Sequence, residues 1–262
     1  DHESTRKEKP LVMEQTTNSY KSMAPQNIAV IGSSGAIGSA LMQQLAAIHP
    51  DATIYTFSRS DPREYSENII HTKIKYESEI SIESAAMKAS EYLPLDMVIV
   101  ATGILHDEVL MPEKSLKDLS AEKFIHLFSV NSVLPAIIAK HFVPRMNKKK
   151  RSVFAALSAR VGSISDNEMG GWYSYRASKS ALNMIIKNVA IETARKNKQA
   201  IFVGLHPGTV ASYLSEPFQS NVPKEKLFTP EFSAKKLIEV LEKLTSRDSG
   251  KFFAWDGEEI EP

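Results

Sequence analysis

The feature that most constrains the fold of this chain is a regular alternation of short apolar runs with segments of helical spacing. The runs NIAVIG and LDMVIVATG are almost wholly apolar, which is typical of strands buried on both faces of a parallel sheet. The segment SALMQQLAAIH places its apolar residues at helical intervals. The order β-α-β-β-α-β-α-β-α-β-α-β predicts an α/β fold, a single doubly wound parallel sheet with helices on both faces.

The predicted strands cover residues 27–32, 52–59, 69–76, 95–103, 151–159, 199–208 and 251–260, and the pattern is weakest at 69–76. The predicted helices cover residues 39–49, 81–93, 120–146, a segment opening within 169–183 and continuing to 197, and 228–244. We expect the last helix to start near Thr229 or Glu231. Pro135 interrupts the pattern of the third helix, so a kink or a break is expected there.

Residues 1–25 are polar and aperiodic and are predicted to form a flexible leader, which leaves 26–262 as one domain. Lysine and arginine number 32 and aspartate and glutamate 31, a balance that gives no electrostatic footprint for nucleic acid. The one basic run, residues 148–151, is interpreted as a solvated loop.

Cysteine is absent, which excludes disulfides and thiolate metal sites, and the seven histidines have no metal-ligand spacing. We therefore predict no metal site. No apolar run approaches the ~20 residues that span a membrane, and the first residues lack the apolar core of a signal peptide. These features predict a soluble, cytoplasmic protein without a membrane partner.

Glycines spaced by three follow the first predicted strand, in the sequence GSSGAIGS. Gly32, Gly35 and Gly38 stand where a strand ends and a helix opens, at the edge where doubly wound sheets bind ligands. Such a turn brings backbone N–H groups close to a phosphate. We interpret it as a dinucleotide site in preference to an ordinary turn. It is not a Walker loop, because no Gly-Lys-Ser/Thr follows.

The second predicted strand ends in TFSRSD. In NAD-binding proteins an acidic residue near this point bonds the ribose 2′-hydroxyl, but here Ser58 and Arg59 hold the place. An arginine would pair with a 2′-phosphate, which favours NADP. The alternative is a surface arginine that caps the loop.

Two further positions leave their interpretation open. Ala101 and Gly103, in VATG, either let a flat ring lie against the backbone or form a tight turn. Asn131 lies in the middle of a predicted helix, where asparagine is unfavourable. Either a local bond that kinks the helix or a functional role would explain it.

A serine and a tyrosine–lysine pair follow the fifth predicted strand. Ser158 comes directly after the apolar run, and Tyr175 and Lys179 are four residues apart, so they share one helix face. Tyr173 has no such partner. The chain contains one Tyr-x-x-x-Lys, and its position indicates either packing or acid–base chemistry with one tyrosine as the acid.

With these parts in this order, residues 26–262 resemble the short-chain dehydrogenase/reductase superfamily, whose domain has the Rossmann fold. The parts are GSSGAIG, the ATG segment, Asn131, Ser158, the Tyr175–Lys179 pair and Pro207-Gly208. SARVGSISDN, GGWYSYRASKSALN and LHPGTV resemble the subgroup named for the myxobacterial cell–cell signalling protein C-factor.

The resemblance implies hydride transfer between NADP(H), with NAD(H) possible, and a small-molecule carbonyl or alcohol. It implies that Tyr175 is the general acid or base, that Lys179 lowers the pKa of Tyr175 and binds the ribose, that Ser158 donates to the substrate oxygen, and that Asn131 holds a water. It also implies a homodimer or homotetramer. The cofactor residues that we expect are Gly32, Ser33, Ser34, Gly35, Ile37, Gly38, Ser58, Arg59, Ala101, Thr102, Gly103, Tyr175, Lys179, Pro207, Gly208, Thr209 and Val210.

This chain departs from the family pattern at several points. Ile31 replaces a threonine, and Gly35 comes one place early, where we expect it to supply the turn. The usual aspartate after the third strand is replaced by Tyr76 or Glu77. Four extra residues separate Ser158 from the tyrosine, and we expect this loop to line the substrate cleft.

Two rival functions share the motifs. One is a cofactor-binding signalling or redox-sensor protein of C-factor type, which the Ser-Tyr-Lys set disfavours. The other is an epimerase or dehydratase of the extended relatives, which usually have a larger C-terminal domain. Three further interpretations stay open. His106 faces either the substrate or solvent, and Trp172 and Tyr173 pack either the cleft wall or a subunit contact. Leu214, Pro217 and Phe218 suggest an apolar lid.

Overall fold

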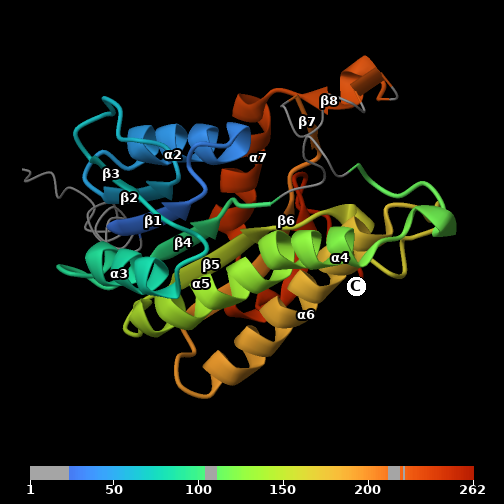
Figure 1. Ribbon diagram of the computed structural model, residues 1–262. Coiled ribbons are helices and arrows are strands. Elements are labelled where there is room, and N and C mark those ends of the chain that lie inside the picture. The colour runs from blue at the N-terminus through green and yellow to red at the C-terminus, as the bar shows by residue number, and fades with distance from the viewer. Residues whose placement is uncertain (1–23, 104–110, 212–218, 221) are drawn as a thin grey trace, which may run out of the picture.

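The computed structural model describes residues 24–103, 111–211, 219–220 and 222–262. Seven strands form one parallel sheet in the order β3-β2-β1-β4-β5-β6-β9 (Figure 1). The chain starts at the central strand β1, runs to one edge, returns to β4 beside β1 and continues to the other edge. This is the doubly wound arrangement that the alternation predicted, and its switch point lies between β1 and β4.

The strands of the sheet are β1 Asn27–Ile31, β2 Thr53–Ser58, β3 Ile69–Lys73, β4 Met97–Val100, β5 Ser152–Leu157, β6 Ala200–His206 and β9 Lys251–Ala254. The helices are α2 Ala36–Ile48, α3 Glu79–Ala89, α4 Ala121–Phe128, α5 Leu134–Phe142, α6 Tyr173–Ala194 and α7 Pro230–Lys243. A short parallel pair, β7 Thr209–Val210 and β8 Leu227–Phe228, was not predicted.

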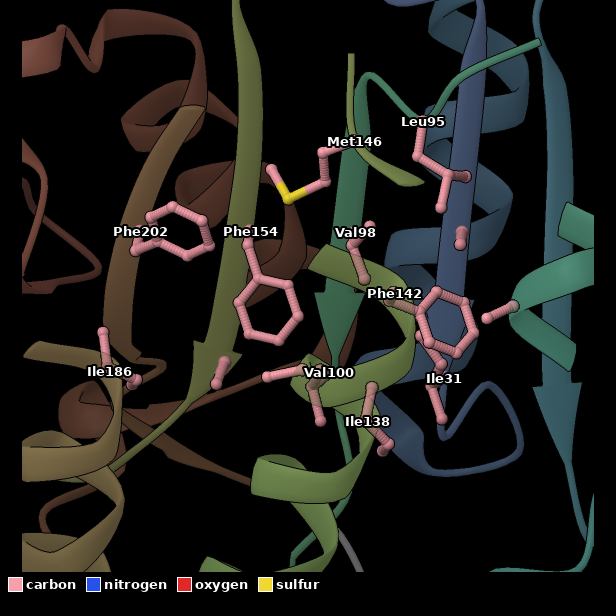
Figure 2. Close-up of a cluster of buried hydrophobic side chains, with 14 of the residues drawn as sticks. Ile31, Leu95, Val98, Val100, Ile138, Phe142, Met146, Phe154, Ile186 and Phe202 are labelled. Carbon is pink, nitrogen blue, oxygen red and sulfur yellow. The ribbon is translucent and has the colours of Figure 1, made fainter. Parts of the chain in front are cut away.

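Helices cover both faces of the sheet, as central strands such as β1 and β4, which are buried along their whole length, require (Figure 1). Helices α3, α5 and α6 contribute to one buried cluster, and α2 and α7 contribute to the other. Figure 2 shows the first cluster, in which Ile138 and Phe142 from α5 and Ile186 from α6 lie against strand residues such as Phe154. The sheet is thereby held between two apolar layers, which fixes the strand ends relative to one another.

The predicted interruption near Pro135 is confirmed as a change of helix type. A π-helical segment, η2 Ser129–Val133, joins α4 to α5, and Pro135 lies in the first turn of α5. The continuous stretch Ala121–Arg145 is long and apolar enough to cross a membrane by length and composition. Within this stretch, α4 and α5 pack against α6, and α5 packs against α3.

The basic run 148–151 is more than the solvated loop that we expected. Lys150 Nζ lies 3.3 Å from Asp96 Oδ2, and Asp96 is buried. Arg151 donates to the carbonyls of Leu241 and Leu244 at the end of α7. Both contacts lie away from the ligand edge, so these charges stabilise the opposite end of the sheet.

Candidate active site

The turn between β1 and α2 depends on two of its three glycines. Gly32 has φ +91°, and a Cβ there would lie 2.7 Å from the Ala101 carbonyl carbon. A Cβ on Gly38 would lie 2.1 Å from the Gly32 carbonyl oxygen. Gly35 has φ −69° and room for a Cβ, with its closest contact at 3.6 Å. The expectation that Gly35 supplies the turn is therefore wrong, because Gly32 makes it.

Of the other residues of this turn, Ser33 holds the turn in place and Ser34 is exposed to solvent. The Ser33 backbone N–H and Oγ both donate to the Phe57 carbonyl, which ties the turn to β2. Ser34 is exposed, and Ile37 is half-buried against the core. No side chain caps α2 and no acidic residue lies in its first turn. The start of this helix therefore suits an anion.

At the end of β2, Arg59 is exposed to solvent and Ser58 is buried. Ser58 is buried, with its Oγ 3.3 Å from His71 Nε2 and accepting the Ser60 N–H. Arg59 is exposed, and its guanidinium carbon lies 6.0 Å from the ring centroid of Tyr76. Loss of solvent raises the pKa of Tyr76 to about 12, against the opposing effect of Arg59. Glu77 is exposed, so Tyr76 is the residue of this pair beside Arg59.

The segment after β4 lies against Lys179 and Asn131. A Cβ on Gly103 would be 3.2 Å from Lys179 Nζ and 3.5 Å from Asn131 Oδ1. The backbone of Ala101 and Thr102 also lies close to Gly32: a Cβ on Gly32 would be 2.7 Å from the Ala101 carbonyl carbon and 2.9 Å from the Thr102 nitrogen. Small residues here thus let the backbone approach both the glycine turn and Lys179, beyond what a simple turn requires.

Asn131 links the π-helical segment to α6. It is fully buried, and its Nδ2 donates to Ser178 Oγ at 3.1 Å. Ser178 Oγ in turn donates to the Tyr175 carbonyl at 2.8 Å. Asn131 therefore lies at the change of helix type and also touches the helix turn that carries Tyr175.

Lys179 and Asn183 of α6 contact the end of β5, at Leu157 and Ser158, and Lys179 also lies beside Tyr175. Ser158 is buried, and its Oγ donates to Asn183 Oδ1 at 2.7 Å. Lys179 Nζ donates to the Leu157 carbonyl at 3.1 Å and lies 5.9 Å from the centroid of the Tyr175 ring. Ser158 is therefore next in sequence to the carbonyl that Lys179 binds, and its own hydroxyl bonds Asn183.

Burial moves the two pKa values of the pair in opposite directions. It lowers the pKa of Lys179 from 10.5 to about 8, because the ammonium loses solvent. It raises the pKa of Tyr175 from 10 to about 12, because the phenolate would lose solvent. We expected Lys179 to lower the pKa of Tyr175, but within the described part of the chain burial is the one influence on this phenol and it acts in the opposite direction. Tyr175 is therefore a protonated phenol at neutral pH.

The start of α6 is held in an unusual way. Gly170, Gly171 and Trp172 have φ of +65°, +68° and +48°, and Trp172 is the one non-glycine residue with positive φ in the described part of the chain. Glu113 is fully buried, and its carboxylate accepts the Ser174 N–H at 3.1 Å and the Ser174 hydroxyl. The Glu113 carbonyl accepts the Trp172 N–H at 2.6 Å. Glu113 therefore caps α6 from a distant segment.

The two aromatic residues at the start of α6 have different surroundings. The Trp172 ring meets the Tyr175 ring edge-on, with centroids 6.2 Å apart. Tyr173 is exposed. Of the two, Trp172 therefore packs against Tyr175 and Tyr173 faces outward.

The segment after β6 rests on an aromatic cluster. Gly208 has φ +78°, and a Cβ there would overlap the Phe228 ring at 2.6 Å. Phe228 also meets Trp255 edge-on at 4.7 Å. The Pro207 carbonyl accepts a bond from Ser233 Oγ at 2.7 Å, and Thr209 and Val210 pair with β8. These contacts fix Pro207, Gly208, Thr209 and Val210 at the end of β6.

Three polar residues of this region escaped the sequence reasoning. Asn183 continues the spacing of four from Tyr175 and Lys179, so extending that pattern would have found it. His206 has a pKa lowered to about 4, mainly by burial, and its Nδ1 accepts the Arg160 N–H. For Glu113 the sequence carries no signal, since its partner Ser174 lies 61 residues away.

The profile of the short chain dehydrogenase family matches residues 26–223. The chain belongs to this family. A 1-hydroxy-2-glutathionyl-2-methyl-3-butene dehydrogenase of Rhodococcus sp. (strain AD45) is 31% identical over 182 residues, which are 69% of this chain and 74% of that relative. The C-signal protein of Myxococcus xanthus is 28% identical over 146 residues, 56% of this chain and 82% of that protein.

Solved structures share the fold of this short-chain dehydrogenase. An NADPH-bound carbonyl reductase from chicken fatty liver has a TM-score of 0.78 at 21% identity, covering 92% of this chain and 95% of that chain. Carbonyl reductase Sniffer of D. melanogaster has a TM-score of 0.75 at 19% identity, covering 91% and 100%. Family membership makes the protein an NAD(P)-dependent oxidoreductase, as the resemblance predicted, and the signalling alternative is not favoured.

The residues of this short-chain dehydrogenase fit a nicotinamide dinucleotide. The Thr102 hydroxyl oxygen is buried and has no hydrogen-bond partner among the described residues, so it is available to a ligand group. The glycine turn leaves no room for a Cβ at Gly32 or Gly38, as a backbone that approaches a phosphate requires. The expectations for His106, Leu214, Pro217, Phe218 and residues 1–23 fall outside the described residues.

Proposed function

We propose that this short-chain dehydrogenase transfers a hydride between NADP(H) and a small carbonyl or alcohol substrate. The observation that carries the proposal is the place of Lys179, whose Nζ lies beside the Tyr175 ring, binds the carbonyl next to Ser158 and lies close to Gly103. The nicotinamide, when bound, would supply the hydride, and the protein supplies placement, a proton and a polar site for the substrate oxygen.

Tyr175 is assigned the proton donor in reduction and the acceptor in oxidation. Its raised pKa keeps the phenol protonated at neutral pH, which suits the donor. Lys179 has three N–H donors, so its bond to Leu157 leaves it able to bind the ribose as well. Ser158 is assigned the hydrogen bond to the substrate oxygen, where charge develops. Asn131 is assigned the water that links Lys179 to solvent.

The cofactor would lie along the switch-point edge. Residues of the turn 32–38 and the start of α2 would bind the pyrophosphate. Arg59 would pair with the 2′-phosphate of NADP, since it is exposed and no acidic residue occupies the position before it. Thr102 and the segment 207–210 would line the nicotinamide side.

Calorimetry with NADPH and NADH tests the cofactor preference. Arg59→Ala should weaken NADPH binding by roughly tenfold or more and leave NADH binding unchanged, because a charge-assisted bond to phosphate is lost. Arg63→Ala is the matched control, since it removes an exposed arginine from the same loop. Equal binding of the two nucleotides by the unaltered protein would contradict NADP preference.

A panel of aldehydes and ketones with NADPH tests the reaction. Tyr175→Phe should lower kcat by roughly 10²–10⁴-fold without weakening NADPH binding, because the proton donor is lost and the ring is kept. Tyr173→Phe, the same change at an exposed neighbour, should have no effect. Tight NADPH binding without turnover of any carbonyl would favour a redox sensor of C-factor type.

We also propose a homodimer or homotetramer. Ile125 on α4 and Met184 and Ile191 on α6 are exposed large apolar side chains, and α4 packs beside α6 (Figure 1). Two copies of this face would cover one another. Light scattering should give a multiple of the chain mass, and Met184→Glu should reduce it; a monomer in both cases would contradict the proposal.

A further inference from the structure

The catalytic serine is not free to act in the arrangement described. Ser158 Oγ donates its hydrogen to Asn183 Oδ1 at 2.7 Å, and both side chains are buried, with exposed fractions of 8% and 7%. A hydroxyl has one hydrogen to donate. While Asn183 Oδ1 holds that hydrogen, Ser158 cannot donate it to a substrate oxygen.

Asn183 belongs to the same stripe of α6 as the catalytic pair. Tyr175, Lys179 and Asn183 follow one another at intervals of four residues, so they lie along one side of the helix. Lys179 Nζ binds the carbonyl of Leu157, and Asn183 binds the hydroxyl of the next residue, Ser158. Two side chains of α6 therefore hold the end of β5.

An amide can resolve the conflict because it has both an acceptor and a donor end. With Oδ1 toward Ser158, the amide takes the hydroxyl hydrogen. With Nδ2 toward Ser158, it donates to Oγ and leaves the hydroxyl hydrogen for another acceptor. A donor to Oγ also polarises the hydroxyl, which makes it a better donor itself.

We infer that Asn183 is a positioning residue that directs the hydroxyl hydrogen of Ser158: its Oδ1 accepts that hydrogen in the arrangement described, and turning its amide releases the hydrogen toward the substrate oxygen. The inference rests on the proposed function, in which Ser158 binds that oxygen. No bond is made or broken in this step, and no proton leaves its oxygen; a hydrogen bond changes partner.

Two substitutions of similar size distinguish a role in directing the Ser158 hydrogen from a role in packing alone. Asn183→Asp keeps an acceptor and, while ionised, has no donor, so it should keep the serine hydrogen and lower kcat by roughly tenfold or more. Asn183→Leu offers neither group and leaves the serine hydrogen free, so it should lower kcat less than Asn183→Asp does. NADPH binding by calorimetry should match that of the unaltered protein in both variants.

A merely structural role predicts the reverse order. If the bond only stabilised the end of β5, Asn183→Asp would keep it and Asn183→Leu would lose it, and the leucine variant would be the weaker enzyme. That order would overturn the inference.

The same two changes made on Ser158→Ala test whether Asn183 acts through the serine. In that background each should alter kcat by less than about twofold, since the group that Asn183 directs is gone. An undiminished effect of Asn183→Asp there would indicate action through Lys179 instead and would overturn the inference. Thermal unfolding adds a readout independent of turnover: the losses in Tm from Ser158→Ala and Asn183→Leu should not add.

The outcome for the unaltered protein separates the two claims. If it reduces no carbonyl, the proposed function fails and the inference fails with it. If it is active and the Asn183 variants lose activity equally with and without Ser158, the inference alone fails.

Discussion

Tyr175 and Lys179 are the residues at which burial has the clearest chemical consequence. Both lose solvent beside the end of β5, so each is pushed toward its neutral form, and the pKa values move apart from a common cause. A neutral phenol can donate a proton, and a lysine with a pKa of about 8 can change its charge near neutral pH. The pair therefore combines a protonated acid with a neighbour that responds to small electrostatic changes.

The lowered pKa of Lys179 predicts a pH dependence of stability. The folded protein has the value of about 8 and the unfolded chain 10.5, so between them the unfolded state binds more protons. The free energy of unfolding should therefore rise, through this group, from about pH 8 to 10. Above pH 10 the raised pKa of Tyr175 acts in the opposite sense, because the folded state then keeps its proton longer.

Lys179→Met should remove this rise, and Lys187→Met, an exposed lysine on the same helix, should preserve it. The measurement is urea unfolding at pH 7, 8, 9 and 10, compared between each variant and the unaltered protein. An unchanged slope in Lys179→Met would show that burial does not depress this lysine.

The glycines of the turn give a second prediction at this scale. Gly38→Ala should lower the free energy of unfolding by about 1–3 kcal/mol and weaken NADPH binding, because its Cβ would meet the Gly32 carbonyl at 2.1 Å. Gly35→Ala should cost less than about 1 kcal/mol, because φ is −69° and the space is open. Urea unfolding and calorimetry measure both; equal losses would contradict the assignment of the turn to Gly32 and Gly38.

Among the elements, α6 carries the chemistry, and its first turn is held from outside. Trp172 stands at the N-cap in a left-handed conformation and provides no side-chain cap. The Glu113 carboxylate fills that role by accepting the Ser174 N–H and hydroxyl, next to the positive end of the helix dipole. A fixed first turn places Tyr175, one residue further on, against the Trp172 ring.

Glu113→Gln should lower the free energy of unfolding by about 1–3 kcal/mol, because the amide lacks the negative charge that strengthens both bonds and replaces one accepting oxygen with an NH₂ group. Kcat should fall with it, since Tyr175 loses its support. Glu122→Gln is the control, because Glu122 is exposed in the first turn of α4 and should matter by at most about 1 kcal/mol. Equal effects of the two changes in urea unfolding would mean that burial of Glu113 adds nothing.

For the whole molecule, the sequence predicted what depends on local pattern and missed what depends on distant contacts. The sheet was predictable because its strands are apolar on both faces, and Thr229 was predictable as the cap of α7, where its hydroxyl accepts the Phe232 N–H. Tyr175 and Lys179 were found by helix spacing. Glu113 was not found, because its contact with α6 forms only when the chain has folded. The role of Gly35 in the turn was misjudged, because a sequence pattern does not report the backbone angle φ.

That residues 26–262 form one domain remains a prediction. The fluorescence of the two tryptophans can test it. Trp172 lies at the start of α6, and Trp255 follows β9 at the edge of the sheet, so single-tryptophan variants report on separate regions. One buried cluster runs from Phe57 and Phe142, whose ring centroids are 6.1 Å apart, to Phe252 on β9. A continuous core should unfold as a unit.

Phe142→Ala should therefore lower the free energy of unfolding by about 3–5 kcal/mol and shift both tryptophan signals and the circular dichroism together, because the cavity lies in a core common to both halves of the sheet. Phe232→Ala, at a residue that is 38% exposed, should cost less. If the Trp255 signal kept its midpoint while the Trp172 signal moved, the chain would contain two units of stability. The site would then lie between units that move separately, and the fixed geometry on which Ser158, Asn183 and Tyr175 depend would not follow from the fold.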